Sequence, residues 1–264
     1  MGDQLARAVL ADVGAVNMFF AVEPECDGPG WVPVGELGRR ADLLAGEVAA
    51  VRTALAGASG CPIERVEERV AASLFYQGLA SRLLSPVVAA AVAHWRIPDP
   101  AGLHWRPDRR GPLVFALGEG TALLPVAAAR DADGSGPGSG APPGDAAALV
   151  AERVVDGLLA PVGTALRALL PVAERLLWGN AASALAGAVR SLAEARPALA
   201  ADARALTAEL LARPPLAGLG SVGPAPGHRF TRTTCCLYYR LPSGGVCGDC
   251  ALAPAAPRRR SAGR

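Results

Sequence analysis

Most of this 264-residue chain consists of segments in which apolar residues recur every three or four positions, separated by prolines and glycines. This spacing places apolar side chains on one face of an α-helix, and that face has to be buried against other helices. Abundant alanine and few aromatic residues (5%) favour helices that pack closely through small side chains. We expect helices over residues 3–22, 36–55, 62–84 and 145–159, a core segment that is apolar on all sides at 87–95, and further helices starting near Pro161, Pro171 and Pro197.

One region departs from the helical period. Residues 112–117 and 121–127, joined by Gly118-Glu119-Gly120, have the composition of two short strands and predict a β-hairpin. After it, residues 131–144 are rich in glycine, serine and proline and predict a flexible surface loop.

The charge and hydropathy patterns indicate whether the chain binds nucleic acid or membranes and in which compartment it works. The net charge of +2 gives no overall attraction to nucleic acid or to anionic membranes, and we find no helix-turn-helix with a basic recognition face. No uninterrupted apolar run is long enough for a transmembrane helix. Because Asp3 and Asp12 lie where an export signal would be positively charged, we expect a cytoplasmic protein with no integral membrane segment.

Four of the six cysteines lie within sixteen residues: Cys235, Cys236, Cys247 and Cys250. They form two pairs separated by ten residues, and Gly244 and Gly245 allow the chain to turn back so that the pairs converge. A large chain without an export signal has little use for disulfides, so metal ligation is the better interpretation. Cys26 and Cys61 are isolated and are interpreted as buried or spare thiols.

The adjacent pair Cys235-Cys236 helps to distinguish a zinc site from an iron-sulfur cluster. Structural zinc usually takes spaced cysteine pairs, whereas a two-iron cluster offers ligand positions that are farther apart. We therefore favour a [2Fe-2S] cluster, with zinc or a disulfide as the alternatives. Such a cluster is negatively charged, and three nearby arginines are candidates to tune it or to attract an anionic chelate, although solvated arginines are an equally good interpretation: Arg229, Arg232 and Arg240.

The cysteine spacing, at the C-terminal end of a mainly helical chain of this size, resembles that of the FhuF family of ferric-siderophore reductases. Two upstream segments, 177–181 (Leu-Trp-Gly-Asn-Ala) and 81–86 (Ser-Arg-Leu-Leu-Ser-Pro), resemble elements of the same family. The resemblance implies packed helices, a C-terminal cluster loop and one-electron reduction of siderophore-bound Fe(III) to Fe(II). Trp178 and Asn180 are then candidates to line the substrate cleft; the alternative is a buried Trp and an Asn at a helix interruption.

This interpretation needs an external electron donor, such as a ferredoxin or a flavin reductase, because the chain has no credible flavin or nicotinamide site. Two other functions stay open: an iron-sulfur redox sensor and a zinc-stabilised interaction protein. We predict a mainly α fold, a multi-helix domain with a minor β-hairpin element and a C-terminal cysteine-rich cluster-binding loop. The predicted divisions are a FhuF-like helical domain at 1–223, a [2Fe-2S]-binding segment at 224–252 and a disordered basic tail at 253–264.

Overall fold

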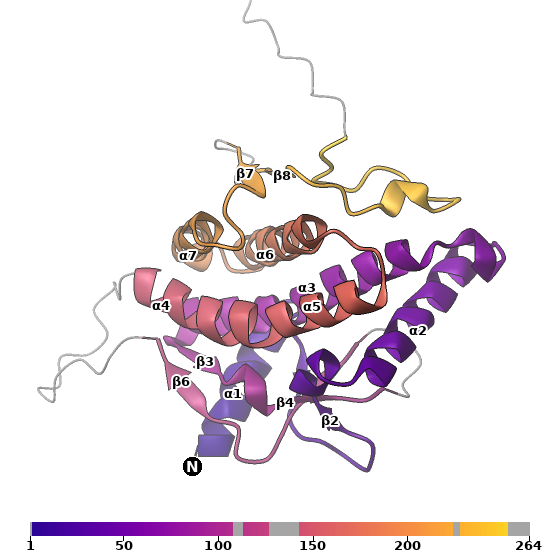
Figure 1. Cartoon of the computed structure of the whole chain (residues 1–264). Coiled ribbons are helices and arrows are strands. Elements are labelled where there is room, and N and C mark those ends of the chain that lie inside the picture. Colours follow the sequence, from indigo (N-terminus) through magenta and orange to yellow (C-terminus); the bar gives the residue numbers. More distant parts are fainter. Residues whose placement is uncertain (1, 108–112, 127–142, 224–227, 253–264) are drawn as a thin grey trace, which may run out of the picture.

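The structure is a computed structural model, and it describes residues 2–107, 113–126, 143–223 and 228–252. Figure 1 shows stacked helices, with short strands on one side and the cysteine segment on the other. The predicted mainly α fold is confirmed. The helices are α1 Gly2–Gly14, α2 Ala41–Ser59, α3 Glu68–His94, α4 Pro143–Val150, a π-helix Ala151–Leu159, α5 Ala160–Leu169, α6 Glu174–Ala195 and α7 Ala200–Ala212, with short 3₁₀ turns Val34–Gly38, Ile63–Arg65, Pro100–Gly102, Pro197–Leu199 and Tyr238–Arg240.

Helix α3 is the centre of the fold. It contacts α1, α2 and α6, and its contact with α6 is the most extensive between any two helices of the described chain. Nearly every side chain from Val70 to Val92 is buried, which confirms the predicted core segment 87–95 over residues 87–92; residues 93–95 are half-buried. A helix surrounded on all sides must be apolar on all sides, and that is what this sequence provides.

Proline 86 lies inside α3, whereas the sequence predicts that the helix ends near residue 84. A proline inside a helix removes one hydrogen bond and costs about 3 kcal/mol. The neighbouring Leu83, Leu84, Val87 and Val88 are completely buried, and each such side chain contributes about 1.5–3 kcal/mol. Packing therefore outweighs the cost of the proline, and the two predicted segments form one continuous helix.

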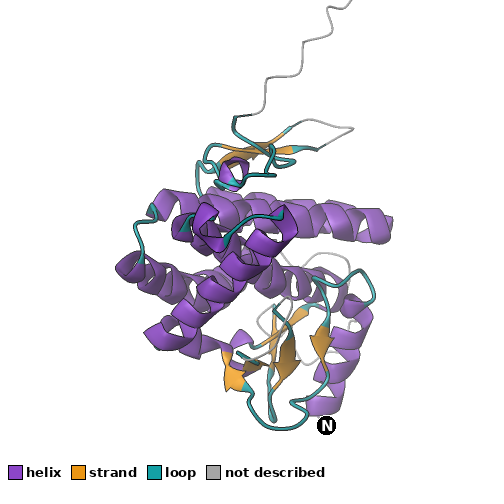
Figure 2. Cartoon of the chain, turned by 90° about the vertical axis from the view of Figure 1, so that its right-hand side faces the viewer, coloured by secondary structure: helices purple, strands orange, loops and turns teal. Residues whose placement is uncertain are grey.

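The strands are short and belong to three small sheets. One has the order β1-β5-β4-β2, the second pairs β3 with β6, and the third pairs β7 with β8. Figure 2 shows the first two below the helices and the β7-β8 pair above them. The bounds are β1 Val22–Glu23, β2 Val32–Pro33, β3 Arg96–Pro98, β4 Leu103–Trp105, β5 Phe115–Leu117, β6 Leu123–Pro125, β7 Gly220–Val222 and β8 Phe230–Arg232.

The predicted pairing of 112–117 with 121–127 is wrong, although both segments contain a strand. Strand β5 pairs with β4 and β1, whereas β6 pairs with β3. Both ends of the turn bond to Gly102 elsewhere in the chain: the amide of Gly118 donates to Gly102 O at 2.9 Å, and Thr121 Oγ1 donates to the same oxygen at 3.2 Å. The chain therefore leaves one sheet and enters the next instead of folding back on itself.

Other predicted boundaries shift by a few residues. Helix α1 ends at Gly14, so the apolar residues after it form a bend and strand β1. The predicted helix at 145–159 continues without a break into α5, and Pro161 lies in the first turn of α5. The predicted loop 131–144 falls mainly, and the basic tail 253–264 entirely, outside the described residues.

The central position of α3 can be tested by truncating Leu83, which has no exposed surface. The variant Leu83→Ala leaves a cavity in the core, so we expect the free energy of unfolding to fall by about 2–5 kcal/mol. Chemical denaturation measures this change. The control Leu5→Ala removes a side chain that is 47% exposed and should alter stability by less than about 0.5 kcal/mol. Equal effects of the two substitutions would contradict a core centred on α3.

Candidate metal centre

The cysteine segment lies across one side of α6 and α3. Strand β8 packs against α6, and the 3₁₀ turn Tyr238–Arg240 packs against α3 (Figure 1). The amide of Thr233 donates to Leu219 O at 2.8 Å, and the amide of Arg232 donates to Asp249 O at 3.1 Å. The second bond closes the segment into a loop, because it joins the residues before the first cysteine pair to those of the second. Strands β7 and β8, which lie on the two sides of the predicted boundary at 223/224, pair with each other.

The four cysteines form two neighbouring pairs. Cys236 and Cys250 are buried, with 3% and 6% of their surface exposed, and Cys235 and Cys247 are half-buried. The Sγ atoms of Cys236 and Cys247, one from each pair, are 3.6 Å apart. Two thiolates that share one tetrahedral metal, with bonds of about 2.3 Å, lie about 3.8 Å apart. The observed spacing therefore fits a shared metal.

The turn between the pairs requires glycine. Gly244 donates its amide to Leu241 O at 2.9 Å, and a Cβ at residue 244 would lie 2.1 Å from Tyr238 O. A side chain cannot be accommodated there, so glycine permits the close approach of the two halves of the loop. The prediction that this residue turns the chain back is confirmed.

Backbone amides point at two of the sulfurs. The Leu237 amide donates to Cys235 Sγ and the Leu252 amide donates to Cys250 Sγ, each at 3.3 Å. Bonds of this type stabilise negative charge on sulfur and are one of the ways in which proteins tune iron-sulfur clusters. Each pair therefore carries a fixed donor for its own thiolate.

Two of the thiols, Cys235 and Cys247, are held in a protonated state when no metal is bound. Burial, followed by the neighbouring Cys236, raises the pKa of Cys247 well above its ordinary value, and burial also raises the pKa of Cys235. Thiols of this kind are poor free nucleophiles. A positively charged metal reverses the balance because it deprotonates a coordinating thiol outright. The donor set thus fits metal ligation.

A chain of buried hydrogen bonds holds the cysteine loop against both helices. Ser73 Oγ of α3 donates to Cys236 O at 2.7 Å, and Asn180 Nδ2 of α6 donates to Ser73 O at 2.8 Å and to its Oγ at 2.9 Å. Arg232 then donates through Nη1 to Asn180 Oδ1 at 2.8 Å and through Nε to Asp249 Oδ2 at 3.1 Å. We call these five residues the anchor network. It joins both cysteine pairs to the core.

Asp249 is the anionic member of the anchor network. Burial alone would raise the pKa of its carboxyl group, but a hydrogen bond with Ser183 and the charge of Arg232 outweigh that effect and lower the pKa. The side chain of Arg232 has no exposed surface, and that of Asp249 is 18% exposed. A buried guanidinium has to be paired, and this carboxylate pairs it.

The structure separates the three arginines that flank the cysteines. Arg232 is buried in the anchor network, whereas Arg229 is exposed and donates through Nη2 to Gly248 O at 2.6 Å. Arg240 lies at the opposite end of the loop and pairs with Glu67 just before α3, with an Nε–Oε1 distance of 2.6 Å. Only Arg229 and Arg232 are thus near the second cysteine pair.

Trp178 and Asn180 both lie inside the protein. The Trp178 indole is 8% exposed, donates to Glu174 Oε1 at 3.4 Å and contacts the Tyr76 ring edge to face, with ring centres 6.2 Å apart. Asn180 is completely buried within the continuous helix α6, so no helix interruption exists there. Its amide belongs to the anchor network. Neither Trp178 nor Asn180 lines the cavity that adjoins Cys247.

The sequence interpretation missed two contributors to the site. Ser73 gives no local signal, because its partner Cys236 is 163 residues away in the chain. Gly179 lies in the Leu-Trp-Gly-Asn-Ala element, but its contact was not foreseen: a Cβ there would lie 1.8 Å from Thr234 Oγ1. Glycine in mid-helix lowers helix stability, so its presence here signals a close approach.

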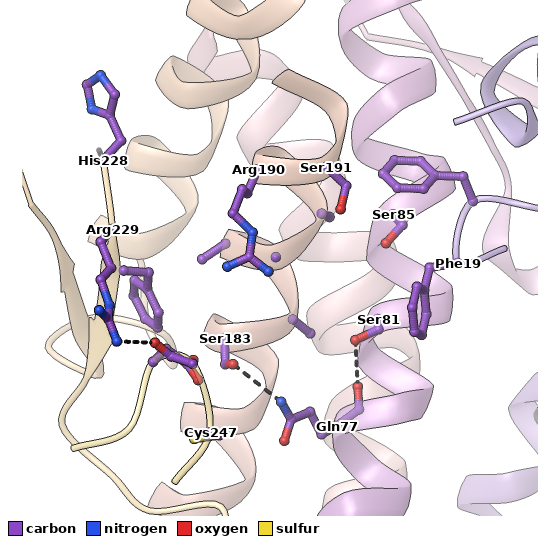
Figure 3. Close-up of a pocket in the computed structure, with 18 residues that line it drawn as sticks. Phe19, Gln77, Ser81, Ser85, Ser183, Arg190, Ser191, His228, Arg229 and Cys247 are labelled. Carbon is purple, nitrogen blue, oxygen red and sulfur yellow. Dashed lines mark hydrogen bonds between the residues drawn. The ribbon is translucent and has the colours of Figure 1, made fainter. Parts of the chain in front are cut away.

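A cavity of about 600 Å³ adjoins the second cysteine pair. Cys247, Gly248 and Asp249 form part of its wall, and the remainder comes from α3, α6, Phe19–Phe20 and residues 228–230. Figure 3 shows polar side chains facing this space from both helices. The cavity therefore opens directly onto the cysteine loop.

Two neighbouring cysteine pairs, amide donors to sulfur and a buried cation are features that fit an iron-sulfur site. Residues 232–252 match the family model FhuF 2Fe-2S C-terminal domain, and this range contains all four cysteines and the whole turn between them. The resemblance to the FhuF family is thereby confirmed, and the cofactor is a [2Fe-2S] cluster. No curated protein and no solved structure matches the chain.

The family match also addresses the zinc alternative. In the described part of the chain, no three Cys, His, Asp or Glu side chains form a ready-made site for one ion. A [2Fe-2S] cluster distributes four cysteine ligands over two irons. We therefore propose that Cys235, Cys236, Cys247 and Cys250 are the cluster ligands.

Removing the cation of the anchor network should release the cluster loop. In Arg232→Gln, the partly buried Asp249 carboxylate loses its charged partner, a change that costs at most about 3–5 kcal/mol, the value for a fully buried pair. We expect lower iron content per chain and a lower midpoint of thermal unfolding, measured by iron assay and calorimetry. The control Arg229→Gln removes an exposed arginine whose bond is to a backbone carbonyl and should keep its iron. Full iron retention in Arg232→Gln would show that the network does not hold the loop.

The close approach of α6 to the cysteine segment gives a second test. In Gly179→Ala, the new methyl group would overlap with Thr234, so the segment must move and iron content should fall. Thr234→Ala removes the overlapping Oγ1, which is buried without a hydrogen-bond partner, and leaves a Cβ 3.0 Å from the new methyl group, so the double variant should recover much of its iron. Gly78→Ala, in α3 with no atom within 4 Å of the new Cβ, is the control. Failure of the double variant to recover iron would refute this contact.

Proposed function

We propose that this protein is a cytoplasmic ferric-siderophore reductase that releases Fe(II) from an Fe(III) chelate. The observation that carries the proposal is the match of residues 232–252 to the FhuF 2Fe-2S C-terminal domain, on a cysteine segment in which Cys247 lines a cavity. A [2Fe-2S] cluster supplies one electron at a time, which suits the one-electron reduction of Fe(III) to Fe(II).

Reduction is itself the release step. Hydroxamate and catecholate oxygens are hard ligands that hold Fe(III) far more tightly than Fe(II). Once the iron is reduced to Fe(II), the chelate binds it far more weakly. The protein therefore needs no general acid or base for this step, and its task is to hold the chelate next to the cysteine loop.

The residues of the chain suit that task. Cys247 lies in the cavity wall and is half-buried, so a molecule in the cavity can come close to the sulfur ligands without opening the core. The Leu237 and Leu252 amides and the guanidinium of Arg232 place positive charge near the thiolates. Such donors stabilise added negative charge and raise the reduction potential of a cluster, which makes the cluster easier for an external donor to reduce.

The electron given to the chelate has to be replaced. We propose an external donor, such as a ferredoxin or a flavin reductase.

No helix in the described part of the chain is both long and apolar enough to cross a membrane.

Anaerobically purified protein provides the decisive test. We expect a coloured protein with two irons per chain, an EPR signal after reduction by dithionite, and stoichiometric Fe(II) capture by ferrozine when a ferric siderophore is added. Cys247→Ser should lose both colour and activity. The control Cys26→Ser changes a cysteine that bonds Leu117 O, away from the site, and should keep both.

Each alternative has its own outcome. A colourless protein with one zinc would overturn the cluster and support an interaction protein. A coloured, reducible protein that yields no Fe(II) from any ferric siderophore would instead support a redox sensor.

A further inference from the structure

The cavity beside Cys247 has a wall that is partly polar and partly apolar. Phe19, Phe20 and Phe230 supply aromatic surface, while α3 and α6 supply serine hydroxyl groups. Its volume, about 600 Å³, is in the range of sites that bury a small organic molecule. A molecule in this space contacts Cys247, Gly248 and Asp249 of the cysteine loop.

Polar groups of the two helices meet in the cavity wall. Gln77 Nε2 of α3 donates to Ser183 Oγ of α6 at 3.4 Å, and Ser81 Oγ donates to Gln77 O at 3.0 Å (Figure 3). Ser85 and Ser191 lie in the same wall. Hydroxyl and amide groups at these positions can bond the oxygen atoms of a ligand.

Two arginines bring positive charge to the wall, which can offset the negative charge of a bound anion and of the neighbouring cluster. Arg190 and Arg229 both line the cavity and are exposed, and neither forms an ion pair with a carboxylate in the described part of the chain. The Asp249 carboxylate, the acidic group of the wall, is paired with the buried Arg232. Figure 3 shows the Arg190 guanidinium projecting into the middle of the space between α6 and α3.

We propose that this cavity is the binding site for an anionic Fe(III) chelate with oxygen ligands of the catecholate or carboxylate type, and that Arg190 is its principal contact. This inference rests on the proposed function and names the substrate class and the place where it binds. The planar guanidinium of arginine matches a pair of anionic oxygens. The serine hydroxyl groups then bond further oxygens, and the aromatic residues cover the organic frame.

Gly187 offers a way to close the cavity without disturbing the core. It lies within α6 and lines the cavity, and no atom lies within 4 Å of the position that a Cβ would take. Leucine has a higher helix propensity than glycine, so Gly187→Leu should fold and project its side chain into the ligand space. The matched control is Gly46→Leu in α2, where the added Cβ also meets open space and no cavity residue is changed.

The test separates binding from reduction by using gallium. Gallium(III) complexes have the size and charge of the ferric complexes but are not reduced. Binding of the Ga(III) complex of a hexadentate tris-catecholate, which is trianionic, and of a neutral tris-hydroxamate is measured by calorimetry on the full chain with its cluster. Reduction of the two Fe(III) complexes is followed in parallel.

We expect the tris-catecholate complex to bind the unmodified protein more tightly than the neutral complex. Arg190→Gln should weaken its binding by about tenfold or more, because a hydrogen bond from a charged donor is lost. Gly187→Leu should prevent binding. Gly46→Leu and the charge control Arg153→Gln, at an exposed residue outside the cavity wall, should bind as the unmodified protein does.

The possible failures are distinguishable. Unchanged affinity in both Arg190→Gln and Gly187→Leu, absence of binding to the unmodified protein, or preference for the neutral complex would overturn the inference. Binding of the gallium complex with the expected losses, but no reduction of the ferric complex, would support the binding site and overturn the proposed reductase function.

Discussion

The buried guanidinium of Arg232 is the interaction on which the rest of the site depends. It bonds Asn180 of α6 on one side and Asp249, between the second pair of cysteines, on the other. A buried charge requires a partner, and here the two partners belong to the helical core and to the cysteine loop. The same bonds that satisfy the charge therefore fix the loop on the core.

The pairing of α3 with α6 gives this arrangement its foundation. Ser73 and Asn180 face each other across the two helices and hold the Cys236 carbonyl. Further along the same helices, serine residues and Arg190 form the wall of the cavity. One helix pair thus supports the cysteine loop and shapes the space beside it, which keeps the two at a fixed separation.

The sequence predicts those parts of the structure that depend on local pattern. The helical segments follow from apolar spacing, and the cysteine spacing predicted the type of cofactor. The pairing of strands β5 and β6 was not predictable, because each pairs with a strand elsewhere in the chain and the turn between them is bonded to Gly102. The same reason applies to α3, where long-range packing overrides the local preference of Pro86 to end the helix.

The site shows the same division. The cysteines and Arg232 lie within one short segment and could be named as candidates from it. Ser73 and the cavity could not, because the residues that form them come together only when α3, α6 and the C-terminal segment pack. Gly179 carried a signal, a glycine in mid-helix, but the identity of its neighbour Thr234 depends on the tertiary fold.

The hydrogen bond from Ser73 to Cys236 has a consequence for biosynthesis. Helices α3 and α6 leave the ribosome before the cysteines do, and chains generally begin to fold from the N-terminal side during synthesis. The surface that receives the cysteine loop is thus complete before the last thiol, Cys250, is translated. We therefore expect the cluster to assemble after the helical core has folded.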